Sequence, residues 1–151
     1  MSNRTLTLIA FIIGVLGIGT LIGMACPPGA WHAALIKPSF NPPNWIFAPV
    51  WTTLYVLIGI AGWRVFVLGQ DSGLRRLWIL QMVLNFAWSP AFFGLQNLAL
   101  GLIVIIPMLI VILAFIWRAK DKDPISAGLF LPYALWVAFA SALTLALNIL
   151  N

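Results

Sequence analysis

Charged residues are scarce in this sequence of 151 residues. They make up only 7% of it, whereas soluble globular domains carry about a quarter. Long uncharged stretches separate the charged positions, and the longest runs from Leu77 to Trp117. A bilayer core about 30 Å thick needs roughly 20 apolar residues per helix, so this stretch is long enough for two transmembrane helices. A water-soluble fold is therefore excluded, and we expect an integral, multi-pass membrane protein in contact with the lipid bilayer.

The side chains that carry most enzyme chemistry are equally few. The sequence holds one histidine, one cysteine, three aspartates and no glutamate. All three aspartates fall at predicted loop positions, so no carboxylate pair lies at membrane depth, and no His/Cys cluster has the composition of a metal site. A single cysteine excludes an internal disulfide. We expect no metal and no required cofactor, and the balance leans against an enzyme.

One nucleophilic arrangement is conceivable from residue type alone. Cys26 and His32 lie close together in the sequence and could form a thiol–imidazole pair. Reactive cysteines need an activating environment, however, and a turn cysteine beside a loop histidine is more often inert. We interpret both as bystanders in this respect. The lack of a charged residue in the middle of any span also argues against an ion-coupled transporter or a proton pump.

The uncharged stretches predict an all-α membrane protein with a bundle of five transmembrane helices in a single domain, 1–151. The predicted helices span about 6–24, 45–67, 73–94, 98–117 and 124–149. The run Cys26-Pro27-Pro28-Gly29 ends the first helix, because proline lacks an amide donor and glycine permits a turn. Asn97 is suited to cap the fourth helix, and Asp123-Pro124 to open the fifth.

The first connection, about 26–44, is predicted to be structured. It contains Trp31, Phe40, Lys37 and several prolines, a composition that argues against disorder. Connections longer than about a dozen residues are usually functional or disordered. We therefore expect a first loop that acts as a lid over the ends of the helices.

The basic residues predict the orientation in the membrane. Seven of the eight lie at the N-terminus, in the second loop or in the fourth loop, and the first loop holds only Lys37. Positive loops stay in the cytoplasm, so we expect a cytoplasmic N-terminus and an exterior C-terminus in a bacterial cell membrane. No basic face with interleaved aromatic residues appears, and we expect no nucleic-acid partner.

Aromatic residues are abundant, with eight Trp, ten Phe and two Tyr. Trp63, Trp78 and Trp117 fall at predicted helix ends and are interpreted as membrane-interface anchors. Three predicted helical faces combine aromatic with polar groups: Phe47, Trp51 and Tyr55; Asn85, Trp88, Ser89 and Phe92; Tyr133, Trp136, Ala140 and Thr144. Polar groups inside a bilayer need partners. Helix–helix hydrogen bonds could supply them, but three such faces beneath a lid favour a mostly apolar ligand pocket.

Several motifs, in order along the chain, resemble one known family. They are Trp31-x5-Lys37-Pro38-Ser39-Phe40-Asn41-Pro42-Pro43, Trp51-x2-Leu54-Tyr55, Asn85-Phe86-Ala87-Trp88-Ser89-Pro90-x-Phe92-Phe93-Gly94 and Pro132-Tyr133-x2-Trp136-x2-Phe139-Ala140. This pattern is similar to that of the tryptophan-rich sensory protein / translocator protein (TspO/MBR, peripheral-type benzodiazepine receptor) family, in a bacterial-type member. The motifs span nearly the whole chain.

The resemblance implies a five-helix protein, often a homodimer, that senses or transports tetrapyrroles such as protoporphyrin IX and haem. Eukaryotic members also bind cholesterol and synthetic benzodiazepine-site drugs. By position, the implied pocket includes His32, Pro42, Phe47, Trp51, Tyr55, Asn85, Ser89, Phe92, Trp136 and Ala140. Trp31 of the lid and Trp88 of the third helix complete the candidate ligand-binding set. Lys37 is a candidate partner for a propionate and equally a solvated loop charge.

The sequence departs from the family pattern in two places. His32 stands where tyrosine is usual, which could change a pH response or bring a haem-iron ligand near the mouth of the pocket. The last helix carries no aromatic-then-basic cholesterol pattern, so a sterol is not the expected native ligand.

Two alternatives to a sensor or transporter stay open. Some family members are reported to promote light-dependent porphyrin breakdown through the tryptophans that match Trp51 and Trp136, which would make the protein a membrane enzyme. The other alternative is a non-catalytic assembly protein that uses its aromatic faces for partner helices. For a homodimer, the glycine-rich first helix with Gly19-x3-Gly23 is the expected interface, with the third helix next. The same small residues could instead pack within one chain.

Overall fold

The structure is a computed structural model that describes residues 2–151. Its long helices are α1 (Asn3–Ala25), α3 (Phe47–Trp63), α4 (Ser72–Ser89), α5 (Leu98–Lys122) and α6 (Pro124–Leu150), and a short α2 (Ala30–Ala34) lies in the first connection. A 3-10 turn (Asn44–Ile46) leads into α3, and wider π-helical turns extend α3 (Arg64–Leu68) and α4 (Pro90–Gly94). Within residues 2–151 there is no strand, and five helical stretches are long and apolar enough to cross a membrane, which confirms the predicted fold class.

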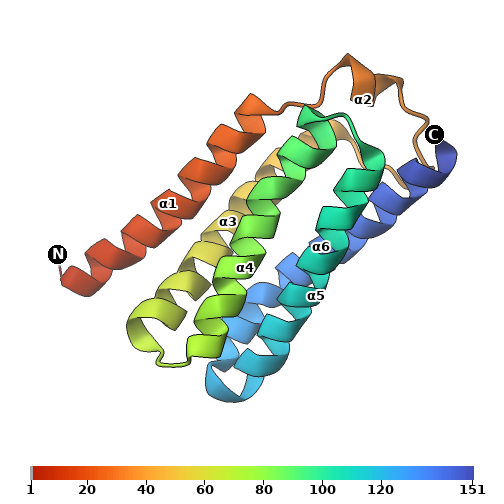
Figure 1. Cartoon of the computed structure of the whole chain (residues 1–151). Helices are drawn as coiled ribbons and strands as arrows, with labels where there is room; N and C mark the ends of the chain where they lie inside the picture. Colours follow the sequence, from red (N-terminus) through yellow and green to blue (C-terminus); the bar gives the residue numbers. More distant parts are fainter. Residues whose placement is uncertain (1) are drawn as a thin grey trace.

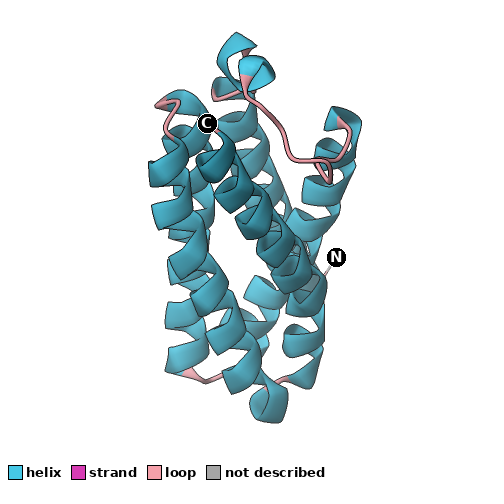
Figure 2. Cartoon of the chain, turned by 90° about the vertical axis from the view of Figure 1, so that its right-hand side faces the viewer, coloured by secondary structure: helices cyan, strands magenta, loops and turns pink. Residues whose placement is uncertain are grey.

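The long helices lie side by side in one bundle (Figure 1). α1 packs mainly against α3, α4 against α5, and α6 against both α5 and α3. The first connection crosses one end of the bundle, where the C-terminus also lies, and the α3–α4 and α5–α6 connections lie at the opposite end (Figure 2). We call the first the lid end and the second the loop end.

α1 is the most peripheral helix, and close contacts at two glycines attach it to α3. Only Val15 and Gly19 of this helix are buried. At Gly59 of α3, an added Cβ would lie 2.9 Å from the Cα of Ile12, so the two backbones touch and a side chain there would push α1 away. At Gly19, an added Cβ would meet the ring of Tyr55. These two close approaches hold α1 against α3.

Side-chain caps begin four of the long helices, and at α1 the Ser2 hydroxyl accepts from the amide of Thr5 at 3.3 Å. The Asn97 carboxamide oxygen accepts from the amide of Leu100 at 2.9 Å, and Asp123 accepts from the amide of Ser126 at 3.4 Å, so both caps lie where the sequence predicts them. Asp71 starts α4 in the same way, accepting from the amide of Leu74 at 2.8 Å. Each cap satisfies an amide that the first helical turn leaves without a partner.

The end of α5 differs from the prediction. The sequence indicates an end near Trp117, before the charged run, but the helix continues to Lys122. Lysines in the last turn interact favourably with the carbonyl end of a helix, and Lys122 also pairs with Asp71 across the loop end. The charged run is therefore a helical extension beyond the apolar span rather than a loop.

Ion pairs join the connections at the loop end. Arg64 donates two hydrogen bonds to Asp123 Oδ1, at 3.2 and 2.8 Å, and one to Oδ2, at 3.1 Å. Arg118 binds Asp71 at 2.8 and 3.1 Å. The hydrogen bonds from Arg118, and then from Lys122, lower the pKa of Asp71. Burial alone would raise the pKa of Asp123, but the hydrogen bonds from Arg64 and Ser126 outweigh it and lower that pKa.

Close packing fills the half of the bundle nearer to these ion pairs. Ile58, Phe115 and Phe130 have no exposed surface. The rings of Phe115 and Phe130 stack with centroids 4.0 Å apart, which joins α5 to α6. The cavity that carries the candidate site lies on the other side of this packed half, towards the lid end.

Candidate functional site

An internal cavity of about 180 Å³ lies beneath the lid, between α3, α4, α5 and α6. Eight of the candidate site residues line it: His32, Phe47, Trp51, Trp88, Ser89, Phe92, Trp136 and Ala140. Thr144, on the same face of α6 as Trp136, lines it as well. The remaining four candidates, Trp31, Pro42, Tyr55 and Asn85, do not. The three helical faces singled out in the sequence thus meet around one space.

Aromatic rings hold each other in place around this cavity. Phe47 of α3 and Trp136 of α6 meet edge to face, with centroids 5.6 Å apart and planes at 73°. Trp88 stacks on Phe92 at 4.9 Å and 17°. Edge-to-face and offset-stacked pairs are the arrangements that aromatic quadrupoles favour. The resulting wall is rich in aromatic rings and is built from several helices.

Asn85 lies in a hydrogen-bond chain rather than on the cavity wall. The Tyr55 hydroxyl donates to Asn85 Oδ1 at 3.1 Å, and Asn85 Nδ2 donates to the Tyr133 hydroxyl at 2.7 Å. Tyr133 in turn donates to Gln81 Oε1 at 2.9 Å, and Gln81 Nε2 donates to the carbonyl of Trp78 at 2.9 Å. These bonds link α3, α4 and α6, so Asn85 and Tyr55 take part here in helix–helix association.

Sequence reasoning missed Gln81, which is fully buried like Tyr133. A signal was available, because Gln81 lies four residues before Asn85 and therefore on the same face of α4.

Two of the lid candidates support the cavity from outside it. Trp31 packs edge to face on Phe92, with centroids 5.8 Å apart, and so backs one cavity wall. Pro42 is half-buried, and its carbonyl accepts from Asn41 Nδ2 at 3.2 Å. Both residues shape the lid without reaching the internal space.

Lys37 and His32 are tied to the short helix α2. The Lys37 ammonium donates to the carbonyls of His32 at 2.7 Å, Ala33 at 3.3 Å and Leu35 at 3.3 Å, so it caps this helix. It would have to leave these carbonyls to meet a propionate. The His32 ring packs on Phe93 at 5.3 Å, and burial, with a further contribution from Lys37, lowers the pKa of His32. The imidazole at the cavity is therefore neutral at pH 7.

The lid is fastened to the end of α6 by one residue. Asn151 accepts from the amide of Ile36 at 2.9 Å and donates to the carbonyl of Ile36 at 3.0 Å. It also donates to the carbonyl of Leu147 at 3.0 Å. We call this set of bonds the Asn151 latch. It ties the middle of the first connection to the helix that carries Trp136.

Four of the eight tryptophan indoles differ in their hydrogen bonds. Trp63 donates to the Thr7 hydroxyl at 3.1 Å, and Trp78 to the carbonyl of Ile58 at 3.0 Å. The indole nitrogens of Trp88 and Trp136 are buried and have no hydrogen-bond partner within residues 2–151. Both of these tryptophans line the cavity.

The interpretation of Trp78 as an interface anchor is wrong. It is half-buried, packs in the gap left by Gly62, and bridges α4 to α3 through its bond to Ile58. Trp117 does fit an interface position, because it is 71% exposed and the Lys120 ammonium lies 3.5 Å from its ring centroid.

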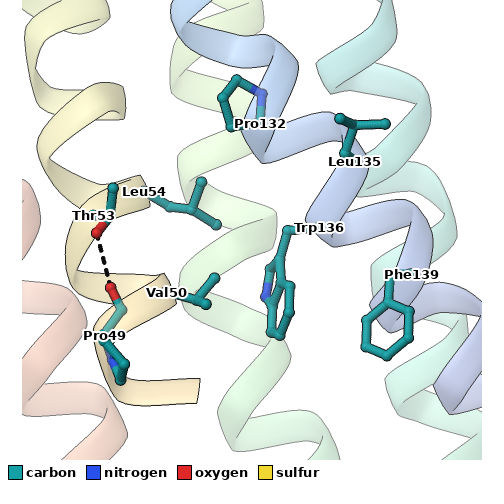
Figure 3. A pocket seen from close by; sticks show the side chains of 8 residues that line it. All are labelled: Pro49, Val50, Thr53, Leu54, Pro132, Leu135, Trp136 and Phe139. Atoms are coloured by element: carbon teal, nitrogen blue, oxygen red, sulfur yellow. Dashed lines mark hydrogen bonds between the residues drawn. The ribbon is translucent and has the colours of Figure 1, made fainter. Parts of the chain in front are cut away.

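A second hollow, of about 560 Å³, lies open on the outer side of α3 and α6. Figure 3 shows its lining side chains, all apolar apart from Thr53, whose hydroxyl donates to the carbonyl of Pro49 at 2.9 Å. In this view the Trp136 ring lies between Val50 and Phe139. Trp136 lines both hollows, so its ring is part of the wall between the cavity and this outer groove. The sequence did not predict the groove.

The glycines of α1 serve different neighbours. Gly19 packs against Tyr55 of the same chain, whereas Gly23 lines the cavity and has open space where a side chain would be. Gly14 and Gly17 have open space where a side chain would be. Small residues allow helices to approach closely in membranes. Gly14 and Gly17 therefore leave an unfilled stretch on α1.

Within residues 2–151, no group of His, Cys, Asp or Glu is arranged to hold a metal ion. Cys26 lines the cavity as a free thiol.

Comparison with known proteins finds similarity along almost the whole chain. The sequence model of the TspO/MBR family matches residues 7–150. The tryptophan-rich protein TspO of Archaeoglobus fulgidus is 42% identical over 150 residues, which cover 97% of each chain. Protein CrtK of Rhodobacter capsulatus is 36% identical over 151 residues, covering 97% of this chain and 94% of that protein. The translocator protein of Homo sapiens is 32% identical over 120 residues, covering 75% of this chain and 70% of the human protein.

Proposed function

The chain belongs to the TspO/MBR family of integral, multi-pass membrane proteins, and we propose that it binds a tetrapyrrole, such as protoporphyrin IX or haem, beneath its lid to sense or transport it. The observation that carries this proposal is the cavity itself, where Trp51, Trp136 and Phe92 from three helices face one space. Flat rings of this kind stack on, or pack edge to face against, an aromatic macrocycle.

Because the cavity is small, the proposal requires part of the protein to move when a ligand binds. At about 180 Å³ it is smaller than the roughly 300–1,000 Å³ of typical ligand pockets, and a ring of four pyrroles needs more space than it offers. Binding therefore requires the lid or the ring of Trp136 to move. The Asn151 latch consists of a few hydrogen bonds, each with a net value of about 0.5–1.5 kcal/mol, so its opening is within reach of ligand-binding energy.

Polar groups of the site have separate roles in this proposal. The Ser89 hydroxyl lines the cavity and is available to a ligand. Asn85 would contribute a hydrogen bond only by releasing Tyr55 or Tyr133. Lys37 would reach a propionate at the cavity mouth once it leaves the carbonyls of α2. The imidazole of His32 lines the cavity and is neutral, so it is the residue that would ligate the iron of a bound haem.

We also propose the finer features that the family implies. The same cavity would accept synthetic benzodiazepine-site ligands, which are smaller than a tetrapyrrole. Two copies would associate through the Gly14–Gly17 surface of α1, with α4 as the other candidate. The loop end would face the cytoplasm, since it holds most of the basic residues.

A second candidate function is light-dependent breakdown of porphyrin. It is favoured by one observation, that Trp51 and Trp136 line the same cavity and could both contact one macrocycle. The two functions separate in a Trp51→Phe variant under illumination. Loss of porphyrin turnover with binding retained would favour the enzyme, and equal dark and illuminated porphyrin levels in the parent protein would exclude it.

The proposal is tested by titrating purified protein with protoporphyrin IX, haem and a sterol while tryptophan fluorescence is recorded. We expect saturable quenching by protoporphyrin IX and haem, and none by the sterol. Quenching that does not saturate with either tetrapyrrole would refute the proposed function. A cavity that stays closed to all three ligands would favour the assembly protein.

A further inference from the structure

Two of the tryptophans that line the cavity have indole N–H groups without a partner. An unsatisfied buried donor costs about 1–3 kcal/mol, and buried indole N–H groups usually find an acceptor. The indole N–H groups of Trp63 and Trp78 donate to an acceptor, whereas those of Trp88 and Trp136 have none within the described residues. The two exceptions come from different helices and meet at one cavity. Within the part of the chain that the structure describes, the buried side-chain polar atoms without a hydrogen-bond partner are therefore these two indole nitrogens, and both residues line the cavity.

We propose that Trp88 and Trp136 donate their indole N–H groups to hydrogen-bond acceptors on the ligand, and so select molecules that carry carboxylate or carbonyl oxygens. This inference rests on the proposed function, because it names the chemical groups of the ligand that the cavity recognises. In the closed state both nitrogens are covered by protein atoms. The enlargement that a macrocycle requires would uncover them, and the ligand would supply the missing acceptors.

The rings that carry these donors are free to adjust. Trp88 is positioned by stacking on Phe92 and by an edge contact with Phe93 at 5.6 Å. Trp136 is positioned by Phe47 and by Phe139, whose centroid lies 5.5 Å away. Within the described residues no hydrogen bond holds either indole, so packing alone sets its rotation. A turn of the Trp136 ring would also join the cavity to the outer groove, since the ring forms part of the wall between them.

The charge of the cavity suits an acceptor-bearing ligand. No aspartate or glutamate lines it, so a carboxylate that enters meets no fixed negative charge there. Hydrogen bonds from neutral donors to a charged acceptor are stronger than those between neutral groups. A ligand with acidic side chains would therefore gain from both indoles, whereas an all-hydrocarbon ligand would leave both unsatisfied.

The test crosses two ligands with conservative variants of the full-length protein. Protoporphyrin IX carries two propionates, and etioporphyrin has the same macrocycle with alkyl groups only. Trp88→Phe and Trp136→Phe remove the N–H and keep an aromatic ring. Trp117→Phe is the matched control, because Trp117 is exposed at the end of its span. Affinity is read from the absorbance of the porphyrin, which does not depend on tryptophan number, and melting temperature verifies folding.

We expect each cavity variant to lose about tenfold in affinity for protoporphyrin IX and less than twofold for etioporphyrin, while Trp117→Phe changes neither. A further readout is the pair of indole ¹⁵N–¹H resonances. Both porphyrins shift them through the same macrocycle ring current, so we expect them to lie further downfield with protoporphyrin IX than with etioporphyrin. Equal losses for both ligands would overturn the inference, since the rings would then act by contact alone. Lys37 could also favour a propionate, but that preference would survive in Trp88→Phe. A parent protein that binds neither porphyrin would refute the proposed function itself.

Discussion

Replacing Trp136 with alanine removes a ring that touches both the cavity and the outer groove. The ring packs on Phe47 and Phe139 at centroid distances of 5.6 and 5.5 Å, so it is an integral part of one cavity wall. An aromatic pair contributes about 0.5–1.5 kcal/mol beyond the burial of area. Loss of both this contact and the buried area on a macrocycle should reach at least about 1.4 kcal/mol, which corresponds to a tenfold loss of porphyrin affinity.

The assay is a porphyrin titration of the purified variant in detergent or nanodiscs, with yield and melting temperature measured alongside. Trp117→Ala is the appropriate control, because this side chain is exposed and distant from the cavity lining. Trp78, although it is also near a helix end, is unsuitable, since its bond to Ile58 makes it part of the bundle. We expect Trp117→Ala to bind porphyrin almost as the parent does. If Trp136→Ala folds normally and keeps parental affinity, the α6 face is core packing and the pocket lies elsewhere.

The remaining predictions concern stability, association and orientation. The melting temperature should fall slightly from pH 7 to 5, because the lowered pKa of His32 means that the unfolded chain takes up a proton more readily than the folded one. It should fall further as the pH drops below about 4, because the pKa of Asp123 is lower in the folded than in the unfolded state and its stabilisation is lost on protonation; Asp123→Asn should be less stable at pH 7 and show a weaker dependence below about pH 4. Asn85→Ala should lower the free energy of unfolding by about 1–3 kcal/mol, because it breaks the hydrogen bonds to both tyrosine hydroxyls. An unchanged melting temperature would contradict the role of this hydrogen-bond chain in holding the helices together. Leucine at Gly14 and Gly17 should yield monomers in light scattering, and a surviving dimer would move the interface to another helix. A reporter fused after Asn151 should read as exterior, and a cytoplasmic signal would reverse the proposed orientation.

The ends of the helices were largely predictable because their signals are local. Asn97 and Asp123 cap the helices that follow them through bonds to amides three residues away, and sequence alone contains that spacing. The end of α5 was not predictable in the same way. Its extension to Lys122 is tied to Asp71, a residue distant in sequence, so the charged run gives no local sign of whether it is a loop or a helix.

The site was predictable as a set of faces but not as a set of contacts. Helical spacing brings Trp51 and Tyr55 to one side of α3, yet only Trp51 lines the cavity, while Tyr55 turns to Asn85. Whether an amide in a membrane helix meets a ligand or another helix depends on which neighbour lies opposite, and that is a tertiary property. The unpaired N–H donors of Trp88 and Trp136 likewise cannot be predicted from the sequence, because whether an indole N–H lacks an acceptor depends on the residues packed around it.

The two ends of the bundle impose a direction on any exchange of ligand. At the loop end, the Arg64–Asp123 and Arg118–Asp71 pairs close the corners above a core in which Phe115 has no exposed surface. At the lid end, the closure consists of the hydrogen bonds of Asn151 and the ring contacts of Trp31 and His32. The bundle is thus closed at one end, unlike a channel that is open at both ends. A molecule that enters beneath the lid meets the packed core of the loop-end half. It leaves past the lid or sideways past Trp136 unless that packed half unfolds.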